Sequence, residues 1–396
     1  MKPDEVLTRE RAGRKRVLFV THVGEPGGGE YKMIDLCRDM RESAEVMLHE
    51  HGPLETLLSS HRIKYSVRPL PATARRVRKE GGLMSILKAV PGVVSLIRGV
   101  AQTTRKFDAV VCFSQKSFVL AALAKPFGRR PIVWFMNDIL APAHFSRTLT
   151  RTVLLLSRVG AKHVVLNSQA SLDAWIESGG RRTNVSVIYP GTFEAAVFAQ
   201  VSDRSRIDFY REIYSPKGAP LIGMFGRIGR WKGQHVFLKA IAAMPEVKAI
   251  VVGGALFGED DYESQVRALA KELGVEYRVA FVGHREDSMK LMAACDVVAH
   301  CSTAPEPFGL VIAEAMLVGI PVVASDAGGA REIVVDNETG LLTPPEDHEA
   351  LANAIRRYLD DPAWSERVVR RARARARTKF SGAAMASSFH EVLDTL

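Results

Sequence analysis

Residues 306–314 read EPFGLVIAE and place two carboxylates, Glu306 and Glu314, eight residues apart. Proline suits the first helical position and disfavours helical geometry in the residue before it, so Pro307 predicts a helix start with Glu306 in a loop. Glu314 is then expected about two turns inside the helix. The N–H groups of residues 309–311 would be unpaired, and such a helix start attracts phosphate. Two carboxylates beside an anion site predict a pocket for a nucleotide sugar. The alternative is a buried helix whose glutamates have no such role.

Length and composition predict a globular protein of two domains. At 396 residues the chain exceeds one typical domain, and no apolar run reaches the ~18–20 residues that span a bilayer. The charged segment Met1–Arg16 leads directly into a predicted strand, so we expect no secretory signal. The four cysteines are scattered, with neither metal-ligand spacing nor a disulfide framework. We therefore expect a cytoplasmic protein.

The net charge of +10 and the pI near 9.5 predict anionic partners. Segment 75–106 carries eight basic residues against one acid, interleaved with apolar pairs. This pattern fits a surface that lies on an anionic membrane, and it fits equally a helix pair packed on its own domain. A second cluster, Arg367–Lys379, has seven basic residues and no acid, and its Arg-Ala alternation predicts an exposed helix.

Short β-branched runs alternate with helical patterns along the whole chain, which predicts parallel α/β units. Apolar runs such as residues 250–252 are typical of strands covered on both faces. Segment Phe193–Gly218 lacks a strand pattern and is the expected connection between domains. The predicted strands are Arg16–Val20, Ala44–His49, Lys64–Arg68, Ala109–Phe113, Ile132–Phe135, His163–Leu166, Val185–Ile188, Leu221–Phe225, Lys248–Val252, Arg278–Val282, Val297–Ala299 and Pro321–Ala324.

Two motifs follow predicted strands and fit phosphate chemistry. Gly24 and the glycines at 27–29 follow the first strand, where they would let the backbone approach a ligand or simply turn the chain. Gly226-Arg227 and, five residues after the arginine, Lys232 follow another strand. A planar guanidinium and a point charge so placed can straddle a pyrophosphate.

Taken with its order of motifs, the chain resembles the large GT4-type family of retaining, GT-B-fold glycosyltransferases over about Val17–Gly340. The segment 306–314 matches that family's E-x7-E signature, the Arg227 and Lys232 pair its G-R…K-G motif, and Gly27-Gly28 its P-x-G-G-x-E loop. The resemblance implies an α/β protein with two Rossmann-like domains facing each other across a cleft. Residues 1–195 would form the acceptor-binding domain and 205–380 the nucleotide-sugar-binding domain, with helix 381–396 returning to the first.

The resemblance also implies the roles of individual residues. Glu306 would hold hydroxyls of the donor sugar, Glu314 those of the ribose, and the cations would neutralise the diphosphate. The residues implied as catalytic are Glu306, Arg227, Lys232 and Asp138. Those implied in donor or nucleotide binding are Gly27, Gly28, Gly226, Gly283, His284, Arg285, Phe308, Gly309, Leu310, Val311 and Glu314.

The N-terminal half departs from the family at one point. Many relatives carry an aromatic-x-His-Asp pattern where this chain has Asn137 followed by Asp138. That histidine usually contacts the donor sugar or the acceptor, so the substitution bears on sugar and acceptor choice. Asn137, His22 and His144 are therefore the candidates for contact with sugar or acceptor.

We expect a hexosyltransferase that uses a nucleoside-diphosphate sugar, a UDP- or GDP-sugar, without cofactor or metal. Retention in such enzymes is assigned to same-face attack, with the departing phosphate taking the acceptor's proton. The expected acceptor is a lipid-linked glycan in polysaccharide or glycolipid synthesis, on the inner face of the membrane. A hydrolysing nucleotide-sugar epimerase of the same fold is the alternative. A non-catalytic nucleic-acid-binding protein is suggested by charge alone and lacks a recognised motif.

Overall fold

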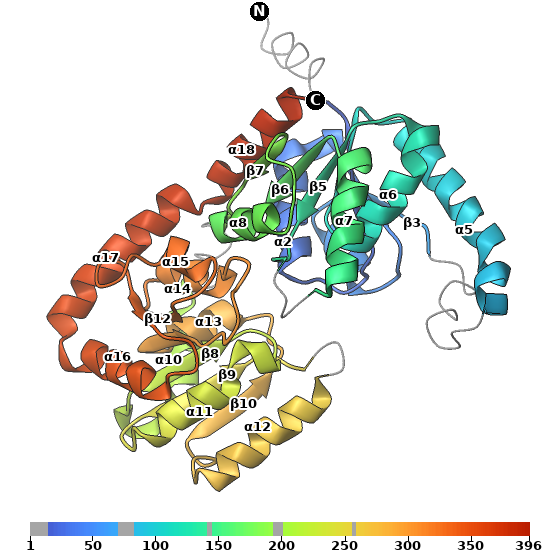
Figure 1. Ribbon diagram of the computed structural model, residues 1–396. Coiled ribbons are helices and arrows are strands. Elements are labelled where there is room, and N and C mark those ends of the chain that lie inside the picture. Colours follow the sequence, from blue (N-terminus) through green and yellow to red (C-terminus); the bar gives the residue numbers. More distant parts are fainter. Residues whose placement is uncertain (1–14, 70–82, 141–144, 193–200, 256–258) are drawn as a thin grey trace, which may run out of the picture. The chain divides into compact units, whose positions relative to one another are not determined.

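The computed structural model describes residues 15–69, 83–140, 145–192, 201–255 and 259–396, and the chain folds into two compact units (Figure 1). Unit 1 comprises Met1–Asn167, Leu172–Ile188 and Ala386–Leu396, and unit 2 comprises Ser168–Ser171 and Tyr189–Met385. The chain therefore enters unit 2 after Ile188 and comes back to unit 1 for its last residues.

The described part of unit 1 is built on a seven-stranded parallel sheet with the order β3-β2-β1-β4-β5-β6-β7. Its strands are β1 (Val17–Thr21), β2 (Ala44–Leu48), β3 (Lys64–Val67), β4 (Ala109–Cys112), β5 (Ile132–Met136), β6 (His163–Leu166) and β7 (Val185–Val187). Its helices include α2 (Gly28–Met40), α3 (Pro53–Ser60), α5 (Leu83–Thr104), α6 (Gln115–Gly128), α7 (Arg147–Gly160) and α8 (Gln169–Glu177). The central strands β1, β4 and β5 are buried along their whole length, as a sheet covered on both faces requires.

The described part of unit 2 has a six-stranded parallel sheet with the order β10-β9-β8-β11-β12-β13. Its strands are β8 (Leu221–Phe225), β9 (Lys248–Val252), β10 (Val279–Gly283), β11 (Val297–His300), β12 (Val322–Ser325) and β13 (Leu341–Thr343). Its helices include α10 (Arg204–Tyr214), α11 (Gln234–Ala242), α12 (Asp260–Glu272), α13 (Ser288–Ala293), α14 (Leu310–Val318), α15 (Ala330–Ile333), α16 (His348–Asp360) and α17 (Pro362–Lys379).

Alternate residues of the unit 2 strands build two separate cores. On β8, Ile222 and Met224 join one core with α11, α12 and α16, whereas Leu221 and Phe225 join the other with α10, α13 and α14. Successive side chains of a strand point to opposite faces, so this division follows from the sequence directly. The layered order places every strand's carboxyl end at the same edge of the sheet, where loops are free to carry functional groups.

The last helix, α18 (Gly382–Asp394), begins in unit 2 and ends in unit 1. Within unit 1, its Phe389 lies 5.9 Å from the ring of Phe19 on β1 and 5.6 Å from that of Phe135 on β5. His390 bonds Asp39 on α2 at 2.7 Å. The final residues of the chain thus complete the core of the unit with which it begins.

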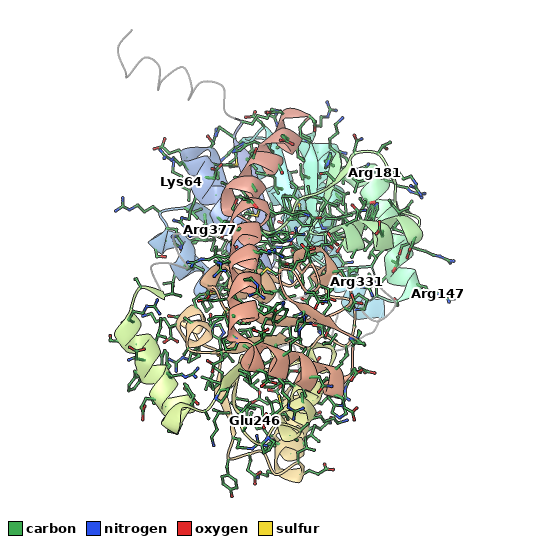
Figure 2. The ribbon with its side chains drawn as sticks, turned by 90° about the vertical axis from the view of Figure 1, so that its left-hand side faces the viewer. Lys64, Arg147, Arg181, Glu246, Arg331 and Arg377 are labelled. Carbon is green, nitrogen blue, oxygen red and sulfur yellow. The ribbon has the colours of Figure 1, made fainter. Side chains whose placement is uncertain are left out.

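The predicted parallel α/β architecture with two Rossmann-like domains is confirmed. All twelve predicted strands are present, three of them with the predicted bounds and the others with ends shifted by at most one residue, and β13 was not predicted. The described part of Phe193–Gly218, the expected connection between the domains, contains helix α10, whose Ile207 and Tyr210 are buried in a unit 2 core. The basic cluster Arg367–Lys379 lies on α17. The helix was expected to be exposed, and Arg377 is (Figure 2), but the helix also buries Ala372 and Ala376 in a unit 2 core.

The two interpretations of segment 75–106 can be compared over its described part. Residues 75–82 lie outside the described residues. In the second half of α5, Leu96, Val100 and Ala101 are buried in the unit 1 core, where they pack with α6. Arg98, Arg105 and Lys106 are exposed. This half of the helix therefore packs its apolar side on its own domain. Along the described residues, no helix is long and apolar enough to cross a membrane.

Candidate functional site

The helix behind the segment 306–314 begins later than the proline predicted. Helix α14 starts at Leu310, so Pro307 is not its first residue and Glu314 lies little more than one turn inside it. The N–H of Gly329 donates to the carbonyl of Glu306 at 2.8 Å, and a Cβ at Gly329 would come within 2.6 Å of Phe308 Cα. This close packing keeps residues 306–308 out of the helix. The chain turns into the helix at Gly309, whose φ is 108°.

The start of α14 has the properties of an anion site. In the described part of the chain, no acceptor pairs with the N–H groups of Gly309, Leu310 and Val311. These are the donors that a helix leaves unpaired at its first turn, where the helix dipole is positive. Phe308 is buried beneath them, with its ring 5.5 Å from that of Phe380. The unpaired N–H groups thus lie in a segment that the buried Phe308 side chain holds in place.

Glu306 lies at the centre of a buried polar cluster. Lys232 Nζ donates to both of its carboxylate oxygens, at 2.9 and 2.8 Å. Ser302 Oγ donates to Oε2 at 2.8 Å, and His300 Nε2 lies 3.2 Å from the same oxygen. Burial by itself would raise the pKa of Glu306, but the Lys232 ammonium and the His300 hydrogen bond outweigh it and hold the pKa well below its usual range. Glu306 is therefore a carboxylate with a fixed orientation.

Glu314 is in the opposite situation. It lies on α14, partly buried, and no hydrogen bond or ion pair with another described residue is made by its carboxyl group. Burial raises the pKa of Glu314 to about 7. Two glutamates of one motif thus differ in state, one held as an anion and the other available to accept hydrogen bonds from a ligand.

Arg227 and Lys232 both lie close to the indole ring of Trp231. The guanidinium carbon of Arg227 lies 5.5 Å and Lys232 Nζ 4.2 Å from the ring centroid. The turn after Lys232 depends on Gly233, whose φ is 76° and where a Cβ would come within 2.0 Å of Cys301 O. This contact fixes the loop that carries Lys232 against the strand end that leads to Glu306. The two predicted cations are therefore brought together on one rigid turn.

Two further glycines bring strand ends close. Gly226 has a φ of 128°, and a Cβ at Gly253 would come within 1.9 Å of its carbonyl oxygen. Gly253 in turn donates its N–H to the carbonyl of Gly283 at 2.8 Å. His284 is exposed after this turn. The loops that follow β8, β9 and β10 thus meet at the edge where the motif residues lie.

Arg285 differs from the other predicted donor-site residues because its guanidinium is engaged within the domain. It donates to Asp287 Oδ1 at 2.8 Å and to Oδ2 at 3.0 Å, and it bonds the hydroxyl of Tyr210 at 2.9 Å. The hydrogen bonds from Arg285 lower the pKa of Asp287 to about 2 despite partial burial. This network joins the loop after β10 to α10.

In unit 1, the glycine loop after β1 is tied to its own helix. Gly27 is the residue before α2, and its N–H donates to Glu30 Oε2 at 3.2 Å. Thr21 Oγ1 donates to the other oxygen of Glu30 at 3.0 Å. Burial raises the pKa of Glu30 in spite of these bonds. Gly28 is the first residue of the helix.

A buried lysine, Lys32, is the main functional candidate in unit 1 that sequence reasoning missed. It is 6% exposed, and its Nζ donates to Asn137 Oδ1 at 2.7 Å. Asn137 Nδ2 donates to the carbonyl of Phe113 at 2.8 Å, so both ends of its amide are held. Burial lowers the pKa of Lys32 to about 8, while the charges of Glu30 and Asp138 oppose the shift. Asn137 and Asp138 are thus next to a buried cation.

Two histidines, His22 and His144, are candidates to replace the family's histidine, and the structure describes one of them. His22 follows β1, and its Nδ1 is buried without a partner among the described residues. Burial, with the charges of Lys116 and His49, lowers the pKa of His22 to about 4, so the ring is neutral near pH 7. His144 lies outside the described residues.

His300 and Ser302 also escaped the sequence reasoning. Both precede the E-x7-E segment, on a strand end that reads as ordinary core. A signal was available in the polar residues at the end of a buried strand, within six positions of Glu306. The described residues contain no group of three or more His, Cys, Asp or Glu side chains placed to bind a metal ion.

Comparison with known proteins finds relatives by sequence and by structure. The model of the protein family described as Glycosyl transferases group 1 matches residues 206–375, which lie in unit 2. The D-inositol 3-phosphate glycosyltransferase of Corynebacterium urealyticum is 33% identical over 208 residues, 50% of this chain and 48% of that protein. The lipopolysaccharide core biosynthesis glycosyltransferase LpsE of Rhizobium meliloti is 31% identical over 191 residues, 48% of this chain and 53% of that protein. The chain thus spans about half the length of the curated relatives that it matches.

One solved structure matches the chain along nearly its whole length. HepE of Anabaena, crystallised in complex with UDP and glucose, is 38% identical and has a TM-score of 0.87. The match covers 97% of this chain and 100% of that one. A second crystal structure of HepE holds UDP-glucose. With the fold, the motif residues and this relative in agreement, the chain belongs to the group 1 glycosyltransferases, the GT4-type family with the GT-B fold.

Proposed function

We propose that the protein transfers a hexose from a nucleoside-diphosphate sugar to a hydroxyl of a membrane-associated acceptor, with retention of configuration. The observation that carries this proposal is the Lys232–Glu306 pair beside the unpaired N-terminal amides of α14. Such a site offers cationic and N–H donors for a diphosphate and a fixed carboxylate for hydroxyls. The complexes of HepE with UDP-glucose and with UDP and glucose support UDP-glucose as the donor to test first.

Each group in unit 2 has a role in this proposal. Arg227, Lys232 and the amides of residues 309–311 stabilise the diphosphate, on which negative charge grows as the sugar–phosphate bond breaks. Glu306 accepts hydrogen bonds from hydroxyls of the sugar. Glu314, whose carboxyl group is available, accepts them from the ribose. The base lies against the turn at Gly283 and His284, where backbone groups select it.

The reaction needs no protein nucleophile in this proposal. The bond from the anomeric carbon to the phosphate oxygen breaks with its electron pair going to the phosphate. The acceptor oxygen bonds the same face of the sugar and gives its proton to the departing phosphate. Unit 1 binds the acceptor, and we place Asp138, Asn137 and Lys32 at that site because a buried cation there orients the two side chains.

A membrane-associated acceptor is supported by the surface of α6 and α7. Phe127, Leu155 and Val159 are 55%, 62% and 68% exposed. The two helices are in contact, and Lys125 on α6 donates to the carbonyls of Val159 and Gly160 on α7 at 3.1 and 2.9 Å. Arg147 projects from the first residue of α7 (Figure 2), and Arg151 and Arg158 are also exposed. Apolar side chains among basic ones are what an anionic membrane surface binds.

The proposal is tested first by thermal shift against UDP-, GDP-, ADP- and dTDP-sugars, with NAD as the control. A donor at about 100 times its dissociation constant adds about 2.7 kcal/mol to the stability of the protein. The expected result is a shift with a UDP-sugar, UDP-glucose first, and none with NAD. No shift with any nucleotide sugar would contradict the proposed function.

Two further measurements separate the remaining alternatives. Incubation of the preferred donor without acceptor should leave it largely intact, whereas an epimerase would convert it to a free sugar. Flotation with vesicles of phosphatidylglycerol and phosphatidylcholine should recover the protein in proportion to the anionic lipid. Leu155→Ser with Val159→Ser should reduce that recovery. Equal flotation on neutral vesicles would remove the role of the basic residues, and a protein that does not float with either kind of vesicle would favour a soluble acceptor.

A further inference from the structure

The hydrogen bonds to Glu306 are divided unequally between its two oxygens. Lys232 reaches both, whereas Ser302 and His300 reach Oε2. Among the described residues, Oε1 has Lys232 as its one partner. Glu306 is 7% exposed, so water has little access to replace a lost partner. Removal of Lys232 would therefore leave Oε1 unpaired while Oε2 remained held by two donors.

The two donors at Oε2 are themselves fixed. Ser302 is 1% and His300 6% exposed, and Ser302 Oγ lies 3.1 Å from His300 Nε2. His300 Nδ1 is buried without a partner in the described part of the chain, so the ring makes all its hydrogen bonds through Nε2. A proton on Nε2 satisfies both contacts, because the serine hydroxyl can accept from the ring and donate to the carboxylate.

We propose that Ser302 and His300 are positioning residues that hold Glu306 through Oε2 when a nucleotide sugar draws Lys232 to its diphosphate, so that Oε1 faces a sugar hydroxyl. The inference rests on the proposed function, because it assigns the sugar half of the same ligand. In this arrangement Lys232 binds the diphosphate, and the Glu306 carboxylate keeps its orientation after Lys232 has moved. The two positioning residues therefore determine how much the sugar adds to the affinity of the nucleotide alone.

The measurable quantity is the ratio of the dissociation constants of UDP and UDP-glucose. Ser302→Ala and His300→Leu each remove a hydrogen bond to a buried charge, so each should lower this ratio about tenfold. Ser302→Thr retains a hydroxyl and His300→Gln retains an N–H donor, and these variants should restore most of the ratio. Ser157→Ala is the matched control, because Ser157 in unit 1 is also 1% exposed and its hydroxyl donates to the carbonyl of Leu154.

A double variant distinguishes positioning from a general structural effect. Once Glu306→Gln has replaced the carboxylate, adding Ser302→Ala should change kcat/KM for UDP-glucose less than twofold. In the unchanged background the same substitution should lower kcat/KM about tenfold, as the loss of one bond to a charged group does. A further tenfold loss in the Glu306→Gln background would overturn the inference.

The remaining outcomes separate this inference from the function on which it rests. If the unmodified protein binds no nucleotide sugar, the proposed function fails and this assignment with it. If it binds UDP-glucose but Ser302→Ala weakens UDP and UDP-glucose equally, the function stands and the positioning role is wrong. Circular dichroism and melting temperatures of Ser302→Ala and Ser302→Thr show whether a loss follows from unfolding instead.

Discussion

Lys232 and Glu306 are 74 residues apart in the chain, and the ammonium of one lies within 2.9 Å of both carboxylate oxygens of the other. The lysine comes from the turn after β8 and the glutamate from the loop after β11, which are neighbouring strands. The pair therefore joins the two loops through which this domain would bind a charged ligand.

Loss of either partner should abolish most of the activity. Glu306→Gln and Lys232→Ala are each expected to lower turnover at least ~100-fold, because one preorganised contact to developing charge is worth about that much. Steady-state kinetics with the identified donor, at a temperature well below both melting transitions, provide the measurement. Near-normal turnover in both variants would show that this pair is not at the reaction site.

The same pair gives a non-additive effect on stability. Lys232→Met leaves a buried carboxylate without its main partner and should lower the free energy of unfolding by about 3 kcal/mol or more. Adding Glu306→Gln should recover much of that loss, because the amide is neutral. Urea denaturation of the two single variants and the double variant measures this. Equal destabilisation in the double variant would show that the loss does not come from an unpaired buried carboxylate.

Glu314 should make the stability of the protein depend on pH. Its pKa is raised by burial to about 7, above that of the unfolded chain, so ionisation disfavours the folded state. The cost is absent below the unfolded pKa and complete above about pH 7, where it reaches about 3 kcal/mol at most. Glu314→Gln should therefore stabilise the protein at pH 8 and leave it unchanged at pH 4. A gain of similar size at both values would exclude this cause.

Donor binding should release protons near neutral pH if the ribose hydroxyls bond Glu314. Hydroxyl donors favour the ionised carboxylate and lower its pKa from about 7. Calorimetry of UDP-glucose binding at pH 6.5, in buffers with different enthalpies of ionisation, measures the number of protons released. UDP-glucose suits this test because its diphosphate does not titrate in that range. The release should disappear in Glu314→Gln, and its persistence would assign it to another group.

Lys32 should contribute in a different range of pH. Its pKa is lowered by burial to about 8, so the charged amine costs stability that is regained as pH rises toward the pKa of the unfolded chain. The stability of the protein relative to Lys32→Met should therefore rise by about 3 kcal/mol at most between pH 8 and 10.5. Turnover of Lys32→Met should fall with little change in UDP affinity. A loss of UDP affinity equal to the loss of turnover would contradict its place at the acceptor.

The regular part of the fold could be predicted because it depends on local pattern. Buried strands such as β8 and β9 show as apolar runs between helical segments, and their bounds agree with the prediction to the residue. β13, Leu341–Thr343, was missed because it lacks the β-branched valines that mark the equally short β7. The start of α14 was misplaced because packing against Gly329 and the turn at Gly309 override the local preference of Pro307.

The motif residues of the candidate site could be predicted from the sequence, but the residues that hold them in place could not. Arg227, Lys232 and both glutamates could be named because they follow predicted strands and match the motifs of the family in order and spacing. Lys32 could not, because nothing in the sequence around it shows that an amine on α2 reaches Asn137, 105 positions away. Long-range pairs between side chains become visible only when the sheet order is known.

The path of α18 has a consequence for how the protein is made. Domains of a growing chain generally fold as units, the first to leave the ribosome first. Here the core around Phe19 and Phe135 is completed by Phe389, which follows unit 2 in the chain. The core of unit 1 can therefore be completed only after the whole of unit 2 has been translated. A stop codon just ahead of residue 386 would thus damage unit 1, although it lies beyond the whole of unit 2 in the chain.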